Sequence, residues 1–130
     1  MSELQAMITR FRQLKIVPVI AVDNAEDIIP LGNALADNGL PVAEITFRTE
    51  CAAEAIKLLR EARPDMLVGA GTVINREQVR QAKAAGAQFV VSPGLNRTPC
   101  RRVSRLISRL CRGLTTPARL SRHWSWASIL

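Results

Sequence analysis

The stretch Val42-Ala43-Glu44-Ile45-Thr46-Phe47-Arg48-Thr49-Glu50 decides how the rest of the chain is interpreted. We expect a buried β-strand here, because Thr46 and Phe47 favour strand over helix. Side chains alternate between the two faces of a strand. The face that covering helices would contact carries Ala43, Ile45 and Phe47, and the opposite face carries Val42, Glu44, Thr46 and Arg48.

Two charged residues of this strand share the second face. Glu44 would lie in the middle of the strand, and Arg48 at or just past its C-terminal end, about 13 Å further along. A charge inside a sheet is unfavourable unless it is paired or used chemically. The pattern therefore indicates either a site that uses both groups, or an edge strand whose ion pair faces water.

The composition fits an enzyme-like body with a basic tail. The chain has 130 residues, enough for one domain, and a net charge of +7. Residues 1–96 hold 10 Lys and Arg and all 11 Asp and Glu, whereas residues 97–130 hold eight arginines and no acidic residue. No apolar run is long enough to span a membrane, and the N-terminus lacks the features of a secretory signal. Three cysteines without metal or redox spacing favour the cytoplasm.

Helical and strand patterns alternate along the body. An amphipathic helix is predicted over residues 3–14, and the remaining elements follow from apolar runs, caps and glycines. Expected strands cover residues 16–22, 42–50, 66–73 and 89–94, and expected helices end near Asn38, Arg63 and Ala85. Such alternation predicts an α/β fold with parallel strands, either an open doubly wound sheet or part of a (β/α)8 barrel.

Both architectures place chemistry at the C-terminal ends of the strands. Glu44, Arg48, Thr72 and Pro93 all fall at or near those ends. Arg48 could grip a carboxylate or phosphate, or be a solvated surface residue. Gly69-Ala70-Gly71-Thr72 could cradle a phosphate, or could mark close backbone packing. Cys51 is better explained by packing than as a nucleophile.

Four motifs give the sequence a family resemblance. They are V-P-V-I-A-V at 17–22, E-I-T-F-R-T-E-C-A at 44–52, V-G-A-G-T-V at 68–73 and F-V-V-S-P-G-L at 89–95. In this order and spacing they resemble the 2-keto-3-deoxy-6-phosphogluconate (KDPG) and 4-hydroxy-2-oxoglutarate (KHG) aldolases. The resemblance implies a class I, Schiff-base aldolase on a (β/α)8 TIM barrel, usually a cytoplasmic homotrimer without metal or cofactor.

The resemblance also implies an activity and a site. The family cleaves KDPG to pyruvate and glyceraldehyde 3-phosphate, or KHG to pyruvate and glyoxylate. Glu44 would be the general acid and base, and Arg48 would hold the carboxylate of the small keto-acid substrate. Thr72 and the backbone of Pro93 would shape the same pocket.

The family's Schiff-base lysine has no counterpart in this sequence. The three lysines are Lys15, Lys57 and Lys83, which fall before the first strand or on helices. Arginine cannot replace the amine, because it stays protonated. We therefore expect a truncated family member that is inactive alone, with the leading helix, three βα units and a fourth strand of the barrel.

The tail is expected to be a separate segment. Residues 1–96 form the partial barrel, and residues 97–130 change abruptly to an Arg-rich composition. A translation out of frame explains this segment best. The alternative is a non-enzymatic protein whose basic amphipathic tail binds nucleic acid or an anionic membrane. With the first explanation, neither nucleic acid nor membrane is a partner.

Overall fold

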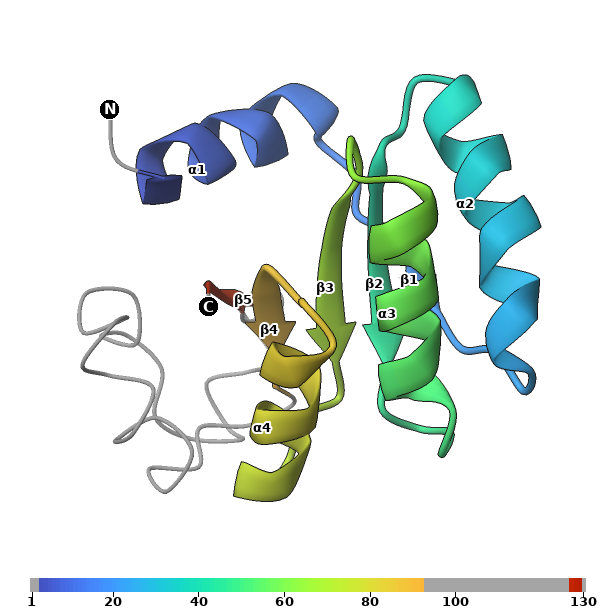
Figure 1. The fold of residues 1–130 in the computed structure, drawn as a ribbon. Coiled ribbons are helices and arrows are strands. Elements are labelled where there is room, and N and C mark those ends of the chain that lie inside the picture. Colours follow the sequence, from blue (N-terminus) through green and yellow to red (C-terminus); the bar gives the residue numbers. More distant parts are fainter. Residues whose placement is uncertain (1–2, 93–126, 130) are drawn as a thin grey trace.

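A computed structural model describes residues 3–92 and 127–129. Helices and strands alternate through most of it (Figure 1). In chain order the elements are α1 (Glu3–Leu14), β1 (Val19–Ile20), the 3-10 helix η1 (Ala25–Asp27), α2 (Ile28–Asp37), β2 (Val42–Thr46), α3 (Ala52–Ala62), β3 (Leu67–Gly71), α4 (Arg76–Ala84), β4 (Phe89–Val91) and β5 (Ala127–Ile129).

The strands form one sheet in the order β1-β2-β3-β4-β5. The first four are parallel, and β5 pairs antiparallel with β4. The α/β fold with four parallel strands is as predicted. Neither β5 nor its antiparallel pairing was predicted. Pro93 and all of the Arg-rich tail except residues 127–129 lie outside the described residues.

Local sequence signals explain the helix boundaries. The side chain of Asn75 caps α4 by accepting a hydrogen bond of 2.8 Å from the backbone N–H of Gln78. Gly39 follows α2 with a φ of 85°, a conformation that favours glycine and ends the helix. These caps confirm the predicted end of α2 and the predicted start of α4.

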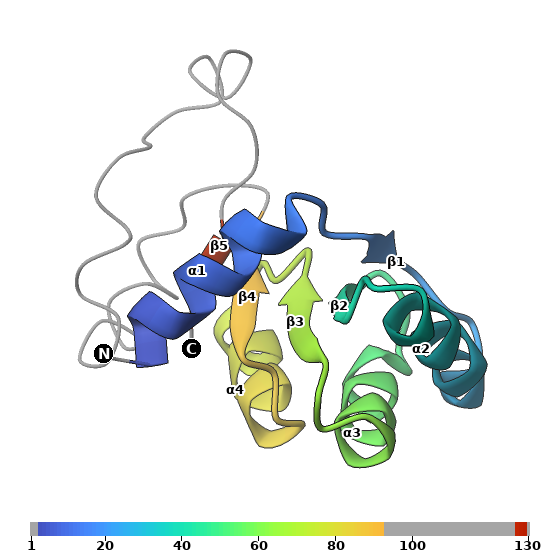
Figure 2. The ribbon, with the colours of Figure 1, turned by 90° about the horizontal axis from the view of Figure 1, so that it is seen from above.

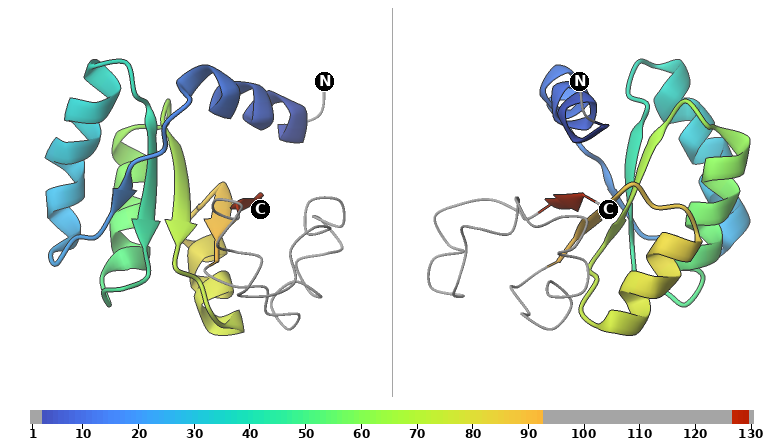
Figure 3. Two further views of the ribbon diagram at one scale, coloured as in Figure 1. Left: turned by 180° about the vertical axis from the view of Figure 1, so that it is seen from behind. Right: turned by 60° about the vertical axis from the view of Figure 1, so that its left-hand side comes forward.

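The two faces of the sheet have different coverings (Figure 2). Helices α2, α3 and α4 pack on one face. The side chains of that face that contribute to the larger core include Ala43, Ile45, Val68 and Ala70. Helix α1 crosses the opposite face near the starts of the strands, as Figure 3 also shows. Its apolar side chains pack there against Val42, Leu67 and Phe89.

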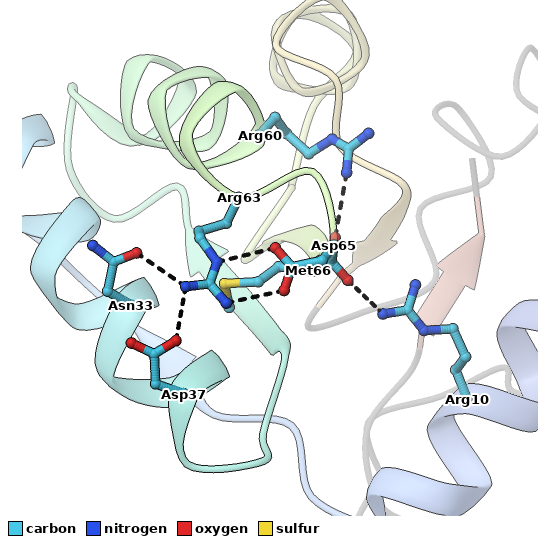
Figure 4. Close-up of polar contacts among 7 residues, drawn as sticks. All are labelled: Arg10, Asn33, Asp37, Arg60, Arg63, Asp65 and Met66. Atoms are coloured by element: carbon cyan, nitrogen blue, oxygen red, sulfur yellow. Dashed lines mark hydrogen bonds and ion pairs between the residues drawn. The ribbon is translucent and has the colours of Figure 1, made fainter.

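A polar network joins the helices at the edge where the strands begin (Figure 4). Arg63 makes two parallel hydrogen bonds of 3.0 Å to the carboxylate of Asp65 and a third of 2.9 Å to Asp37 on α2. Arg10 on α1 donates to the carbonyl of Asp65 at 2.8 Å. The hydrogen bond from Arg63 holds the pKa of Asp65 below its usual range. This edge is therefore held by ion pairs and hydrogen bonds, whereas folds with parallel strands and covering helices place their chemistry at the opposite edge, where the strands end.

Candidate active site

Strand β2 brings a carboxylate to the face that α2, α3 and α4 do not cover. All five residues of the strand are buried. Ala43 and Ile45 belong to the core beneath the helices, so alternation turns Glu44 and Thr46 to the opposite face. Only 7% of Glu44 is exposed. This confirms the predicted assignment of faces and excludes a strand whose carboxylate lies in water.

The side chain of Glu44 lies across the neighbouring strand. Glu44 pairs in register with Gly69, and Thr46 pairs with Gly71. A Cβ atom on Gly71 would overlap with Oε1 of Glu44 and would lie 2.8 Å from its Cδ. The carboxyl group therefore rests on the bare backbone of Gly71, near the C-terminal end of β3. The structure thus shows close packing of a side chain against Gly71, one of the two explanations given for the Gly69–Gly71 stretch.

Burial controls the acidity of Glu44. Removal from water raises the pKa of the Glu44 carboxyl above its ordinary value, and the positive charge of Arg48 opposes part of this increase. Among the described residues, no hydrogen-bond donor reaches the carboxylate. A carboxyl group in such surroundings gains or loses a proton closer to neutral pH than an exposed glutamate does.

Arg48 lies in the turn that follows β2. Strand β2 ends at Thr46, and the backbone N–H of Phe47 donates to the carbonyl of Gly71 at 2.8 Å. Phe47 and Arg48 then lie in a turn, so the chain does not continue straight to position 48 as an extended strand would. The exposed guanidinium of Arg48 is close enough to Glu44 to affect its pKa. The site thus offers a cation to an anionic ligand beside a buried acid.

Thr72 follows β3 in a conformation that is unusual for its residue type. Its φ is 55°, in the left-handed region that β-branched residues rarely adopt. Such backbone outliers concentrate at functional sites. The residue is half-buried and directly follows Gly71, so it lies at the same edge of the sheet as Glu44 and Arg48. Three of the four predicted site residues thus share this edge, and Pro93 lies outside the described residues.

Two polar side chains that the sequence did not single out as site residues support this edge. Thr46 donates from its hydroxyl to the carbonyl of Ile20 on β1 at 3.0 Å. Cys51 donates from its thiol to the carbonyl of Val22 at 3.2 Å. These bonds tie the end of β2 to β1, and the start of α3 to the segment that follows β1. The position of Cys51 agrees with the packing role expected for it.

The lysines lie away from this edge. Lys15 follows α1, Lys57 lies on α3 and Lys83 lies on α4, and all three are exposed. The two helices that carry Lys57 and Lys83 cover the face opposite to Glu44. Within the described ranges, no group of three or more His, Cys, Asp or Glu side chains could hold a metal ion.

Comparison with known proteins gives one consistent family. The family described as KDPG and KHG aldolase matches residues 7–125. A 2-dehydro-3-deoxy-phosphogluconate aldolase of Haemophilus influenzae is 58% identical over 113 residues, which cover 87% of this chain and 50% of the relative. The KHG/KDPG aldolase of Escherichia coli is 48% identical over 80 residues, 62% of this chain and 38% of the relative. The chain thus spans about half the length of its curated relatives or less.

Solved structures agree. The KDPG aldolase of Zymomonas mobilis superposes with a TM-score of 0.65 at 42% identity, over 69% of this chain and 43% of that one. A KDPG aldolase of Legionella pneumophila, crystallised with pyruvate as a covalent carbinolamine, gives 0.63 at 45% identity, over 65% and 41% of the two chains. The parallel sheet of this chain therefore matches part of each aldolase fold.

Proposed function

Because this chain belongs to the KDPG and KHG aldolase family, we propose that its described residues form the proton-transfer and keto-acid-binding part of an aldolase site. The reaction would release pyruvate from KDPG or KHG. The observation that carries the proposal is the buried carboxyl of Glu44, whose pKa is raised and which lies near Arg48 at the C-terminal edge of a parallel sheet.

Glu44 would move protons during cleavage of the carbon–carbon bond. A class I aldolase holds its keto acid as a Schiff base, and a base takes the proton of the substrate hydroxyl as the bond breaks. The same group can then return a proton to the carbon that becomes the methyl group of pyruvate. A carboxyl whose pKa is raised toward neutral serves both steps, because both of its protonation states are accessible.

Arg48 and Thr72 would orient the substrate. A guanidinium donates two parallel hydrogen bonds to a carboxylate, which fixes the plane of an α-keto acid. Arg48 is exposed and makes no hydrogen bond to any other described residue, so its donors are available to a ligand. The hydroxyl of Thr72 would contribute a further hydrogen bond, and the backbone of Pro93 would complete the pocket.

The amine for the Schiff base would not come from the three lysines of this sequence. All three are exposed; Lys57 and Lys83 lie on the helices that cover the face opposite to Glu44, and Lys15 directly follows α1, at the edge where the strands begin. We therefore expect no covalent adduct when this chain is treated with pyruvate and borohydride and then weighed by mass spectrometry. The Legionella pneumophila aldolase is the positive control. An adduct on this chain would contradict the assignment.

Binding of pyruvate to the partial site tests the proposal directly. Pyruvate should shift the backbone NMR signals of Arg48 and Thr72 in the wild-type chain, and Arg48→Ala should abolish these shifts. Arg12→Ala removes an exposed arginine of α1 and should leave them unchanged. Equal shifts in both variants would show that Arg48 does not hold the carboxylate.

The assembly and the location are further parts of the proposal. We expect the trimer implied by the family, which light scattering would detect; a designed cage of fused symmetric oligomeric domains also aligns with 68% of this chain. None of the helices among the described residues has the length and apolar character to cross a bilayer. A cytoplasmic location stays a prediction.

A further inference from the structure

We propose that Gly71 is a positioning residue of the site, whose bare Cα supports the carboxyl group of Glu44 while its carbonyl oxygen holds the turn that carries Arg48. This inference deepens the proposed function and rests on it for the roles of the acid and the guanidinium. The contacts themselves are independent of any aldol chemistry.

The first half of the argument is steric. A Cβ at position 71 would overlap with the Oε1 atom of Glu44, and it would also lie 2.8 Å and 2.9 Å from the Cδ and Cγ atoms. Real Cβ atoms do not approach other heavy atoms this closely, so any other residue would displace the carboxyl from the sheet. The φ angle of Gly71 is not positive, unlike those of Gly39 and Gly86. Space, and not backbone conformation, is therefore the reason for glycine.

The second half concerns the backbone of the same residue. The carbonyl of Gly71 accepts the N–H of Phe47 at 2.8 Å, which is the first hydrogen bond after the end of β2. Arg48 follows immediately, so this bond fixes the backbone from which the Arg48 side chain extends. The next residue, Thr72, has a φ of 55°, and Val73 then donates to the carbonyl of Val91 at 3.1 Å. The end of β3 at Gly71 is thus bonded to the β2 side through Phe47 and, two residues later, to β4 through Val73.

Gly69 shows that the two glycines of the pair have different functions. Both lie on the same face of β3, two residues apart. A Cβ at position 69 would overlap with the ring of Phe89 instead of the side chain of Glu44. Gly69 therefore makes room for the apolar cluster beneath α1, and Gly71 makes room for the acid. This difference supplies a matched control.

A double-mutant cycle tests the steric contact. At pH 4, where the Glu44 carboxyl is protonated and its burial is least unfavourable, Gly71→Ala should lower Tm by roughly 4–8 °C, the effect of a modest overpacking in a small domain. In the Glu44→Ala background the same substitution should leave Tm unchanged or raise it, because alanine is the better strand residue when nothing obstructs it. If only the double variant folds, the proposal also holds. An equal loss of Tm in both backgrounds, or a double variant that does not fold, would overturn it.

The titration of Glu44 shows whether Gly71 positions the carboxyl group or only contributes to the stability of the fold. In Gly71→Ala, the carboxyl signal of Glu44 in ¹³C NMR should titrate at a lower pH than in the wild type, because the displaced group regains water. Gly69→Ala should destabilise the same strand and leave that titration in place. An unchanged titration in Gly71→Ala refutes the proposal even if pyruvate binds, and loss of pyruvate binding to the wild type would refute only the proposed function.

Discussion

Replacing Glu44 by glutamine should stabilise the fold at neutral pH. The carboxylate is almost fully buried, its exposed fraction is 7%, and no hydrogen bond to a described residue compensates for its lost hydration. Glu44→Gln keeps the shape and removes the charge. We expect the free energy of unfolding at pH 7 to rise by about 1–2 kcal/mol, because a neutral amide loses less hydration on burial than a carboxylate does.

The pH dependence follows from the direction of the pKa shift. The folded chain binds the proton of Glu44 more tightly than the unfolded chain does, because burial raises the pKa above its ordinary value of 4.5. The contribution of Glu44 to stability is therefore fully present below pH 4.5 and is lost as the pH rises through the folded-state pKa. The advantage of Glu44→Gln should disappear in acid and grow toward neutral pH.

Urea unfolding from pH 4 to pH 8, followed by circular dichroism, measures both effects. Glu54→Gln provides the control, because Glu54 is an exposed residue on α3 and its replacement should change stability little at any pH. If Glu44→Gln gained nothing at pH 7, or gained equally at pH 4, burial would not be what raises the pKa of Glu44.

Substitutions at two further positions test the packing beneath α1 and the cap of α4. Phe89→Ala should lower the free energy of unfolding by about 3–5 kcal/mol in urea titrations. The Phe89 ring is buried and packs edge-on against Phe11, with 5.0 Å between the ring centroids. A loss below 1 kcal/mol would place the ring outside the core. Asn75→Ala should cost about 1 kcal/mol through loss of the cap of α4, and Asn75→Asp should restore most of it, as thermal melts would show.

The sequence predicted the class of fold and the face of each residue on β2, because strand alternation depends only on local order. It overestimated the length of β1, which covers Val19–Ile20 and not residues 16–22. Pro18 lacks an N–H, and Val19 is 60% exposed, so the start of that run contributes little to the sheet. The carbonyl of Pro18 still accepts a hydrogen bond from the backbone N–H of Glu44, so the chain runs beside β2 there.

The details of the site could not be predicted from local order. The contact between Glu44 and Gly71 depends on the register of β2 against β3, which joins residues 27 positions apart. The left-handed conformation of Thr72 contradicts the preference of a β-branched residue, and only the tertiary structure imposes it. The division of the chain at residue 97 stays a prediction, and the coding DNA beyond Arg97, translated in all three frames, would test it.

The position of α1 has a consequence for the order of assembly. Two of its long-range contacts, Arg10 to Asp65 and Phe11 to Phe89, join it to the turn before β3 and to β4, which are synthesised 55 and 78 residues later. The helix is synthesised before these partners, and its binding surface, which also includes Val42 and Leu67, is complete only when β4 has been added to the sheet. The N-terminal segment must therefore wait, and it is the element we expect to dock last and to detach first when the native state opens locally.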